Sequence, residues 1–204
     1  MIHGLVGLNG SGKSTLLRCM YGLMKPKSGT VNINEQQANK RSITLLETEP
    51  YFYHGINGKE YLSLFQEDGI AKFAINEWAS LFHLTMEDLI ESYSTGMKKK
   101  LAILGVIKTN KPVLLLDEPF NGLDLESSRV LSTVLNRLRS SGKTIIITSH
   151  MLETMISLCD RIHYLKNGSI DRVFKAGDAE SIHKEVFQEL DANIQSQVNN
   201  LLKL

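Results

Sequence analysis

The sequence is poor in cysteine and proline, and it has no long apolar run. Its two cysteines among 204 residues, Cys19 and Cys159, lack the spacing of a metal site, so we expect buried thiols in a reducing compartment. No apolar stretch approaches the roughly 20 residues that a membrane-spanning helix needs, and no secretion signal opens the chain. These absences predict a cytoplasmic chain that reaches a membrane only through a partner protein.

An excess of one charge sign is also missing, since 23 Lys and Arg residues are balanced by 22 Asp and Glu residues. A net charge of +1 gives no long-range attraction to nucleic acid or to anionic lipid. The basic clusters Lys25/Lys27 and Lys98–Lys100 are short and contain no aromatic residues, so we interpret them as solvated faces. With 42% hydrophobic and 22% charged residues, the composition is that of one globular domain.

What the sequence does contain is a glycine-rich loop between a short strand and a helix. After a largely apolar run over residues 2–6, Gly7–Ser14 fits the pattern G-x-x-x-x-G-K-[ST]. Such a loop binds phosphate groups through successive backbone N–H groups at the start of a helix. Lys13 would reach the β- and γ-phosphates, and the Ser14 hydroxyl would bind Mg²⁺. A glycine turn without function is the alternative, but every fixed position of the pattern is filled in the order strand, loop, helix.

Two carboxylates and a histidine follow further apolar strands. The run 113–116 ends in Asp117 and Glu118, and His150 lies just past a second run, 143–148. In doubly wound sheets ligands bind outside the carboxyl ends of the strands, so we expect these groups to converge on the phosphates. Asp117 would bind Mg²⁺, Glu118 would orient or deprotonate the attacking water, and His150 would contact the γ-phosphate or that water. Taken singly, a surface turn and a helix-capping histidine are the alternatives.

The rest of the chain predicts the frame around these motifs. Residues 57–89 carry aromatic and aliphatic residues at helical spacing with no strand between them, which predicts an α-helical insert at about residues 55–95 with the aromatics as its core. The tail, about 178–204, has one apolar helical stripe that packs on its own domain or on a partner. Further expected elements are strands at 30–34 and 42–46, helices at 98–109 and 124–140, a helix N-cap at Ser94, and a hairpin around Asn167-Gly168.

Together these motifs resemble the ATP-binding subunit of ATP-binding cassette (ABC) transporters over nearly the whole chain. The resemblance implies a single domain, 1–204, with the α/β fold of a P-loop NTPase. This is a doubly wound, mostly parallel sheet with an α-helical insert and a partial antiparallel β-subdomain. The matching motifs are Gly7–Thr15 for Walker A, Val113–Glu118 for Walker B, Ser94–Met97 for the signature, Asn121–Asp124 for the D-loop and Thr148–His150 for the switch histidine.

The resemblance also implies ATP hydrolysis with Mg²⁺, in which Glu118 and His150 are the catalytic residues. ATP would lie between two cassettes, because the signature of one subunit binds the γ-phosphate held by Walker A of the other. One copy of each half-site in the chain then implies a homodimer or a closely similar second subunit. The implied ATP-binding residues are Gly7, Asn9, Gly10, Ser11, Gly12, Lys13, Ser14, Thr15, Ser94, Gly96 and Asp124, and the implied Mg²⁺ ligands are Ser14, Asp117 and Thr48.

A transmembrane permease is the further partner that the resemblance implies, with the chain peripheral on the inner face of the cell membrane. The form Y-S-x-G-M of residues 93–97 is similar to export-type cassettes. No nucleic-acid partner is expected. Two other functions stay open from the sequence: a soluble ABC-type ATPase acting on DNA or the ribosome, and a non-catalytic nucleotide-binding module.

The sequence departs from the family pattern in two places. Thr48 stands where the family has the Q-loop glutamine; it keeps an oxygen for Mg²⁺ but has a shorter reach. The family also has two strands before the phosphate loop and an aromatic residue there that stacks on adenine, whereas here Met1 lies directly before the first strand. We therefore expect weaker ATP binding and an incomplete β-subdomain.

Overall fold

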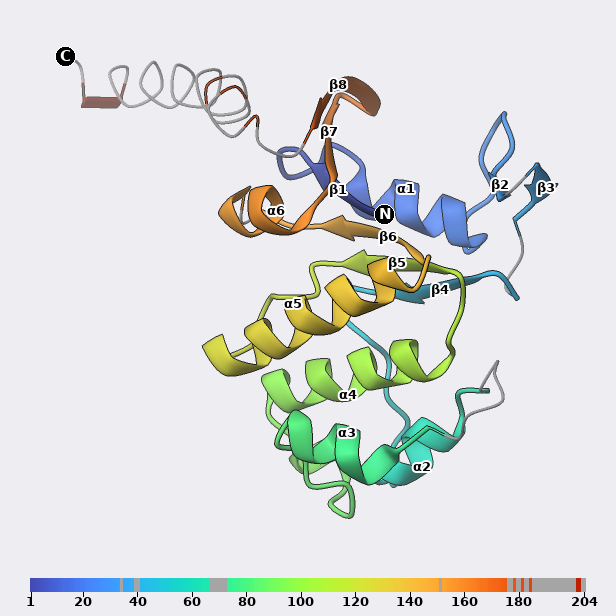
Figure 1. Ribbon diagram of the computed structural model, residues 1–204, viewed down its shortest axis with the longest axis vertical. Helices are drawn as coiled ribbons and strands as arrows, with labels where there is room; N and C mark the ends of the chain where they lie inside the picture. The colour runs from blue at the N-terminus through green and yellow to red at the C-terminus, as the bar shows by residue number, and fades with distance from the viewer. Residues whose placement is uncertain are drawn as a thin grey trace.

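A six-stranded sheet forms the centre of the computed structural model, which describes residues 1–33, 35–38, 41–66, 73–150, 152–175, 178, 181, 184 and 201–202 (Figure 1). The strand order is β4-β5-β6-β1-β7-β8, and each neighbouring pair is parallel except β7 and β8. The doubly wound, mostly parallel α/β fold is thus confirmed. The strands are β1 (Ile2–Val6), β4 (Ile43–Leu46), β5 (Val113–Asp117), β6 (Thr144–Thr148), β7 (Arg161–Lys166) and β8 (Ser169–Lys175).

Helices cover both faces of this sheet. Alternate residues of a strand point to opposite faces, and in β5 Leu115 packs with Leu17 of α1 (Lys13–Tyr21). Leu114 and Leu116 belong instead to the larger core with α4 (Thr95–Lys108), α5 (Leu125–Ser140) and α6 (Leu152–Leu158). Burial on both faces explains why these strands are continuous apolar runs.

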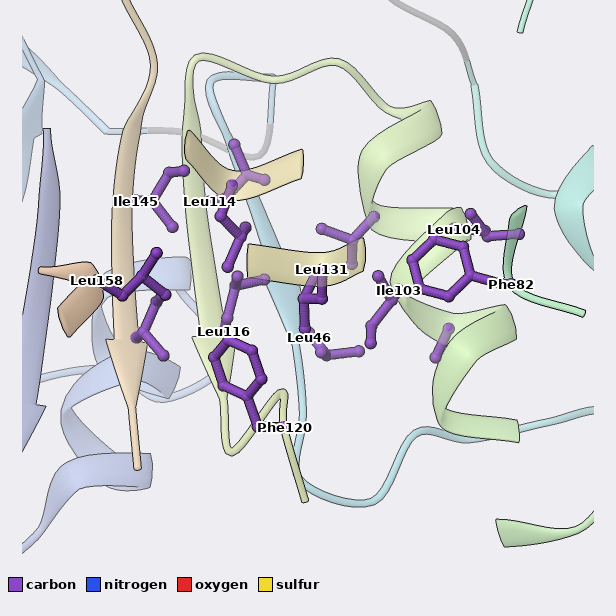
Figure 2. Close-up of a cluster of buried hydrophobic side chains, with 14 of the residues drawn as sticks. Leu46, Phe82, Ile103, Leu104, Leu114, Leu116, Phe120, Leu131, Ile145 and Leu158 are labelled. Carbon is purple, nitrogen blue, oxygen red and sulfur yellow. The ribbon is translucent and has the colours of Figure 1, made fainter. Parts of the chain in front are cut away.

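The larger core extends from the sheet into the helical insert. Figure 2 shows it running from Ile145 and Leu114 in the strands, past Leu131 of α5 and Leu104 of α4, to Phe82. The insert comprises α2 (Gly58–Ser63), α3 (Ile75–Leu81) and a 3-10 turn (Ile90–Ser92), and Figure 1 shows α2 and α3 on the far side of α4 from the sheet. The aromatic residues of the insert belong to this core, as predicted: Tyr61, Phe82 and Tyr93 are buried in it, and Phe65, Phe73 and Trp78 are partly buried against it.

The helix cap at Ser94 and the hairpin turn at Asn167-Gly168, both predicted from the sequence, are present in the structure. The Ser94 hydroxyl accepts a hydrogen bond from the Met97 N–H at 3.2 Å and begins α4, which confirms the predicted N-cap. Asn167 and Gly168 both have positive φ (49° and 80°), the geometry of the two-residue turn that joins β7 to β8. Among the described residues of the strand predicted at 30–34, Asn32–Ile33 (β2) pairs with Gln36–Gln37 (β3), and the Ala38 N–H donates to the Val31 carbonyl oxygen at 2.8 Å.

The two cysteines differ in burial. Cys159 is buried, and its surroundings, together with the nearby Asp160 charge, raise the pKa of its thiol to about 12, so it is inert as a nucleophile. Cys19, on α1, is only partly buried, so the prediction of two buried thiols was wrong for it. Within the described residues no helix has the length and apolarity to cross a bilayer. The predicted C-terminal helix over 178–204 lies almost entirely outside the described residues.

A histidine pair on β1 and β7 predicts a pH-dependent stability. His3 Nδ1 lies 3.1 Å from His163 Nε2. Partial burial is the main cause that lowers the pKa of His3, and repulsion from His163 lowers it further. Partial burial also lowers the pKa of His163. The unfolded chain therefore takes up protons first as the pH falls through 6.5, the ordinary value for both. The contribution of this pair to the free energy of unfolding is therefore fully present above pH 6.5 and declines as the pH falls below it.

Urea unfolding at pH 7.5 and pH 5.5 measures this dependence. The free energy of unfolding should fall on acidification, and it should fall less in His3→Gln, which leaves one titrating ring in the pair. An equal fall in the variant and the wild type would contradict this account of the pair.

Candidate functional site

The glycines of the phosphate loop are required by its backbone geometry. A Cβ on Gly7 would lie 2.3 Å from the Leu165 carbonyl oxygen of β7, so no other residue fits without moving that strand. Gly10 and Gly12 have φ of 80° and 104°, which L side chains rarely adopt. Gly12 is the N-cap of α1, so the loop ends at the N-terminus of that helix, where the helix dipole is positive.

The loop forms one wall of a hollow of about 310 Å³ at the carboxyl edge of the sheet. Lys13 Nζ donates to the carbonyl oxygens of Gly7 at 2.8 Å and Leu8 at 3.3 Å, which holds its ammonium over the loop. The buried Ser11 hydroxyl has no hydrogen-bond partner among the described residues. The Lys13 ammonium and the backbone N–H groups at the helix start together suit a chain of phosphates. The hollow is lined by Asn9, Gly10, Gly12, Lys13, Ser14, Thr15, Asp117 and Glu118.

Strand order brings the predicted catalytic groups together. β5 and β6 are parallel neighbours, so the residues that follow them meet at one edge. His150 Nδ1 lies 3.0 Å from Glu118 Oε2, and the Glu118 side chain is only 16% exposed beside the phosphate loop. Asp117 and Glu118 therefore line the hollow, and His150 lies beside Glu118; their roles toward phosphate and water stay predictions.

Glu118 has a strained backbone for a residue with a side chain. Its φ is 50°, in the left-handed region, and such positions cost free energy unless the surroundings fix them. The Glu118 N–H donates to the Thr148 hydroxyl at 3.0 Å, which helps to hold this conformation.

Two threonine hydroxyls orient the Asp117 carboxylate. Thr148 donates to Oδ1 at 2.5 Å and Thr48 donates to Oδ2 at 2.9 Å. Each carboxylate oxygen keeps further lone pairs for a cation, and the Ser14 hydroxyl lines the same hollow, so hard oxygen ligands of the kind Mg²⁺ prefers are gathered there. Thr48 lies beside Asp117, as its prediction as a ligand requires. From the sequence, Thr148 was named only as the first residue of the switch-histidine motif, and its contact with Asp117 was not predicted, because a threonine at the end of an apolar strand does not reveal its partner.

The signature residues lie at the start of α4 and not in the lining of this hollow. Gly96 packs against the D-loop, since a Cβ there would lie 2.8 Å from the Gly122 carbonyl oxygen. Asp124 caps α5 through the Ser127 N–H at 2.7 Å and pairs with Lys100 at 2.8 Å. The Lys100 ammonium, with the Ser127 hydrogen bonds, holds the pKa of the Asp124 carboxyl far below its usual range.

The interpretation of the Lys98–Lys100 run as a solvated face was wrong for two of its members. Lys99 is 4% exposed and Lys100 7% exposed, and both ammonium groups have partners inside the protein. Burial lowers the pKa of Lys99, against the opposing pull of the Asp117 and Glu118 charges. The signal that would have found them is their position within the first two turns of a helix that is otherwise apolar.

Residues 1–121 match the family model described as "ABC transporter". The chain belongs to the ABC transporter family. Two uncharacterized ABC transporter ATP-binding proteins of Bacillus subtilis are similar to it: YhcH is 35% identical over 83% of the chain and 59% of YhcH, and YybJ is 31% identical over 83% of the chain and 82% of YybJ. The chain thus spans little more than half the length of YhcH.

Solved structures agree with this ABC fold. The ATP-binding subunit of an ABC transporter superposes with a TM-score of 0.80 at 25% identity, over 95% of this chain and 88% of that one. The dimeric ATP-binding cassette MJ0796, in a post-hydrolysis state with ADP and phosphate, superposes with a TM-score of 0.74 at 23% identity, over 86% of this chain and 85% of that one. The second likeness is evidence for the fold.

Gly7→Ala tests the phosphate loop of this ABC protein as a steric fit. Because the new methyl group meets the main chain of β7, the loop must shift, and we expect the free energy of unfolding to fall by about 1–3 kcal/mol. Gly4→Ala, within β1 just before the loop, is the matched control, since its methyl group meets the flexible end of Met155 at 2.9 Å. Denaturant unfolding compares the two variants; an equal or larger loss in Gly4→Ala would contradict the steric account.

Proposed function

We propose that this chain is the ATP-binding and ATP-hydrolysing subunit of an ABC transporter. The observation that carries the proposal is the placement of the Glu118–His150 pair against the hollow of the phosphate loop. A phosphate loop alone would support binding only. A carboxylate held by a histidine beside that loop supplies a group that can act on water next to the terminal phosphate.

The residues of the hollow divide the chemistry between them. The loop N–H groups and Lys13 bind and neutralise the phosphates. Glu118 accepts a proton from the attacking water or orients it, and His150 holds the Glu118 carboxylate in place. Mg²⁺ would be held by Ser14 and Asp117, with Thr48 beside them, and when bound it neutralises charge that develops on the phosphate oxygens.

The position of the signature supports a site shared between two subunits. Ser94 is exposed at the N-terminus of α4 and does not face the hollow of its own chain, so its hydroxyl and the Gly96 N–H are available to a second copy. Anions bind favourably at such a helix start. In the proposed dimer each ATP lies between one phosphate loop and the partner's signature. Asp124 would stabilise this surface through its ion pair with Lys100 of α4.

The remaining features belong to the same proposal. A permease partner would hold the chain at the inner face of the membrane, and the Y-S-x-G-M form of the signature favours export. The near-neutral composition favours no nucleic-acid partner.

Glu118→Gln tests the catalytic assignment. The amide keeps the size of the side chain but cannot take a proton, so ATP turnover should fall by about 100-fold or more while ATP binding persists. Glu77→Gln, at an exposed position of α3, is the matched control and should keep full turnover. Unchanged turnover in Glu118→Gln would show that another group activates the water.

Mixing two inactive variants tests whether the ATP site is shared. Lys13→Ala removes the phosphate contact, and Ser94→Asp keeps the helix cap but places a negative charge at the signature. Each mixed dimer would rebuild one complete site, so random pairing should restore about one quarter of the wild-type ATPase rate. A site built within one chain predicts no recovery in the mixture.

A further inference from the structure

A buried lysine of α4, Lys99, links that helix to Asp117 in the lining of its own hollow. Lys99 Nζ donates to the Thr48 carbonyl oxygen at 3.0 Å and to those of Glu47 and Asp117 at 3.4 Å each. These carbonyls come from two segments, the loop after β4 and the end of β5. A single ammonium group thus joins three pieces of chain: α4, the Thr48 loop and the Asp117 strand.

The residues that Lys99 holds are the two partners of one side-chain hydrogen bond. The Thr48 hydroxyl donates to Asp117 Oδ2 at 2.9 Å, while Lys99 fixes the main chain of both residues. If the ammonium is removed, the buried Asp117 carbonyl and the partly buried carbonyls of Glu47 and Thr48 lose a donor, and the Thr48 loop is free to move away from Asp117. The orientation of the carboxylate then depends on Thr148 alone.

We propose that Lys99 is a positioning residue, which sets Asp117 for Mg²⁺ and ties this setting to the signature. Ser94 and Gly96 begin the same helix, and Lys99 follows Ser94 by five residues, about 7.5 Å along the axis. The first turns of α4 therefore present the signature at one end and hold the Asp117–Thr48 pair through Lys99. A shift of α4 when the signature meets ATP would move the Mg²⁺ ligand of the other site. This inference rests on the proposed function.

Lys99→Met, Lys99→Arg and Lys98→Met form a matched set of variants. Methionine has a similar length and no donor, whereas arginine keeps the charge and the donors. Lys98 neighbours Lys99 on α4, is only half-buried, and has no side-chain hydrogen bond recorded among the described residues. Should Lys99→Met fail to fold, Lys99→Gln replaces it, since its shorter neutral amide cannot span all three carbonyls.

The first readout is amide hydrogen exchange of the chain without nucleotide. In Lys99→Met, exchange should speed up at residues 46–49 and 117–118 and stay unchanged in α5. Lys98→Met and Lys99→Arg should match the wild type. Unchanged exchange at residues 46–49 would overturn the link that Lys99 makes.

The second readout is equilibrium ATP binding in the Glu118→Gln background, titrated with Mg²⁺ and repeated in EDTA. The Mg²⁺ midpoint should rise by about 10- to 100-fold in Lys99→Met, as for other residues that orient metal ligands, with binding in EDTA unchanged. An unchanged midpoint, or an equal loss of binding in EDTA, would overturn the positioning role. If the parent chain binds no ATP at all, the proposed function and the positioning role both fail. The exchange result then still tests whether Lys99 holds the Thr48 loop against Asp117.

Discussion

The parallel register of neighbouring strands is the constraint on which the proposed site depends. β4, β5, β6 and β1 end at one edge of the sheet, so segments separated by about a hundred residues meet there. The phosphate loop follows β1, Asp117 ends β5 and Glu118 follows it, and His150 follows β6. β4, β5 and β6 contribute residues to cores on both faces of the sheet, and this packing helps to position the charged groups at their ends.

Polar contacts then refine what the strands bring together. Asp117 receives hydroxyl groups from Thr48 and Thr148, and Glu118 is held by Thr148 and His150. These contacts offset the free-energy cost of the left-handed backbone conformation at Glu118. Lys99 adds a connection from the signature helix, so the surface proposed to meet a second subunit and the Asp117 side of the hollow are parts of one network.

The sequence alone predicted the features that depend on local pattern. The phosphate loop, the apolar strands and the Ser94 cap follow from short-range chemistry, and the convergence of Asp117 and His150 follows from parallel strand ends. Burial of Lys99 was not predictable, because it depends on a loop some fifty residues earlier closing over α4. The left-handed backbone of Glu118 was likewise hidden, since it results from tertiary contacts and not from the residue itself.

The central claim is that two copies of this chain hold ATP between them. The most direct measurement is the solution mass of the Glu118→Gln variant by sedimentation or light scattering, with and without saturating ATP and Mg²⁺. The account predicts the mass of two chains with ATP and of one chain without it. A mass of one chain under both conditions, with ATP binding verified in the same sample, would contradict the shared site.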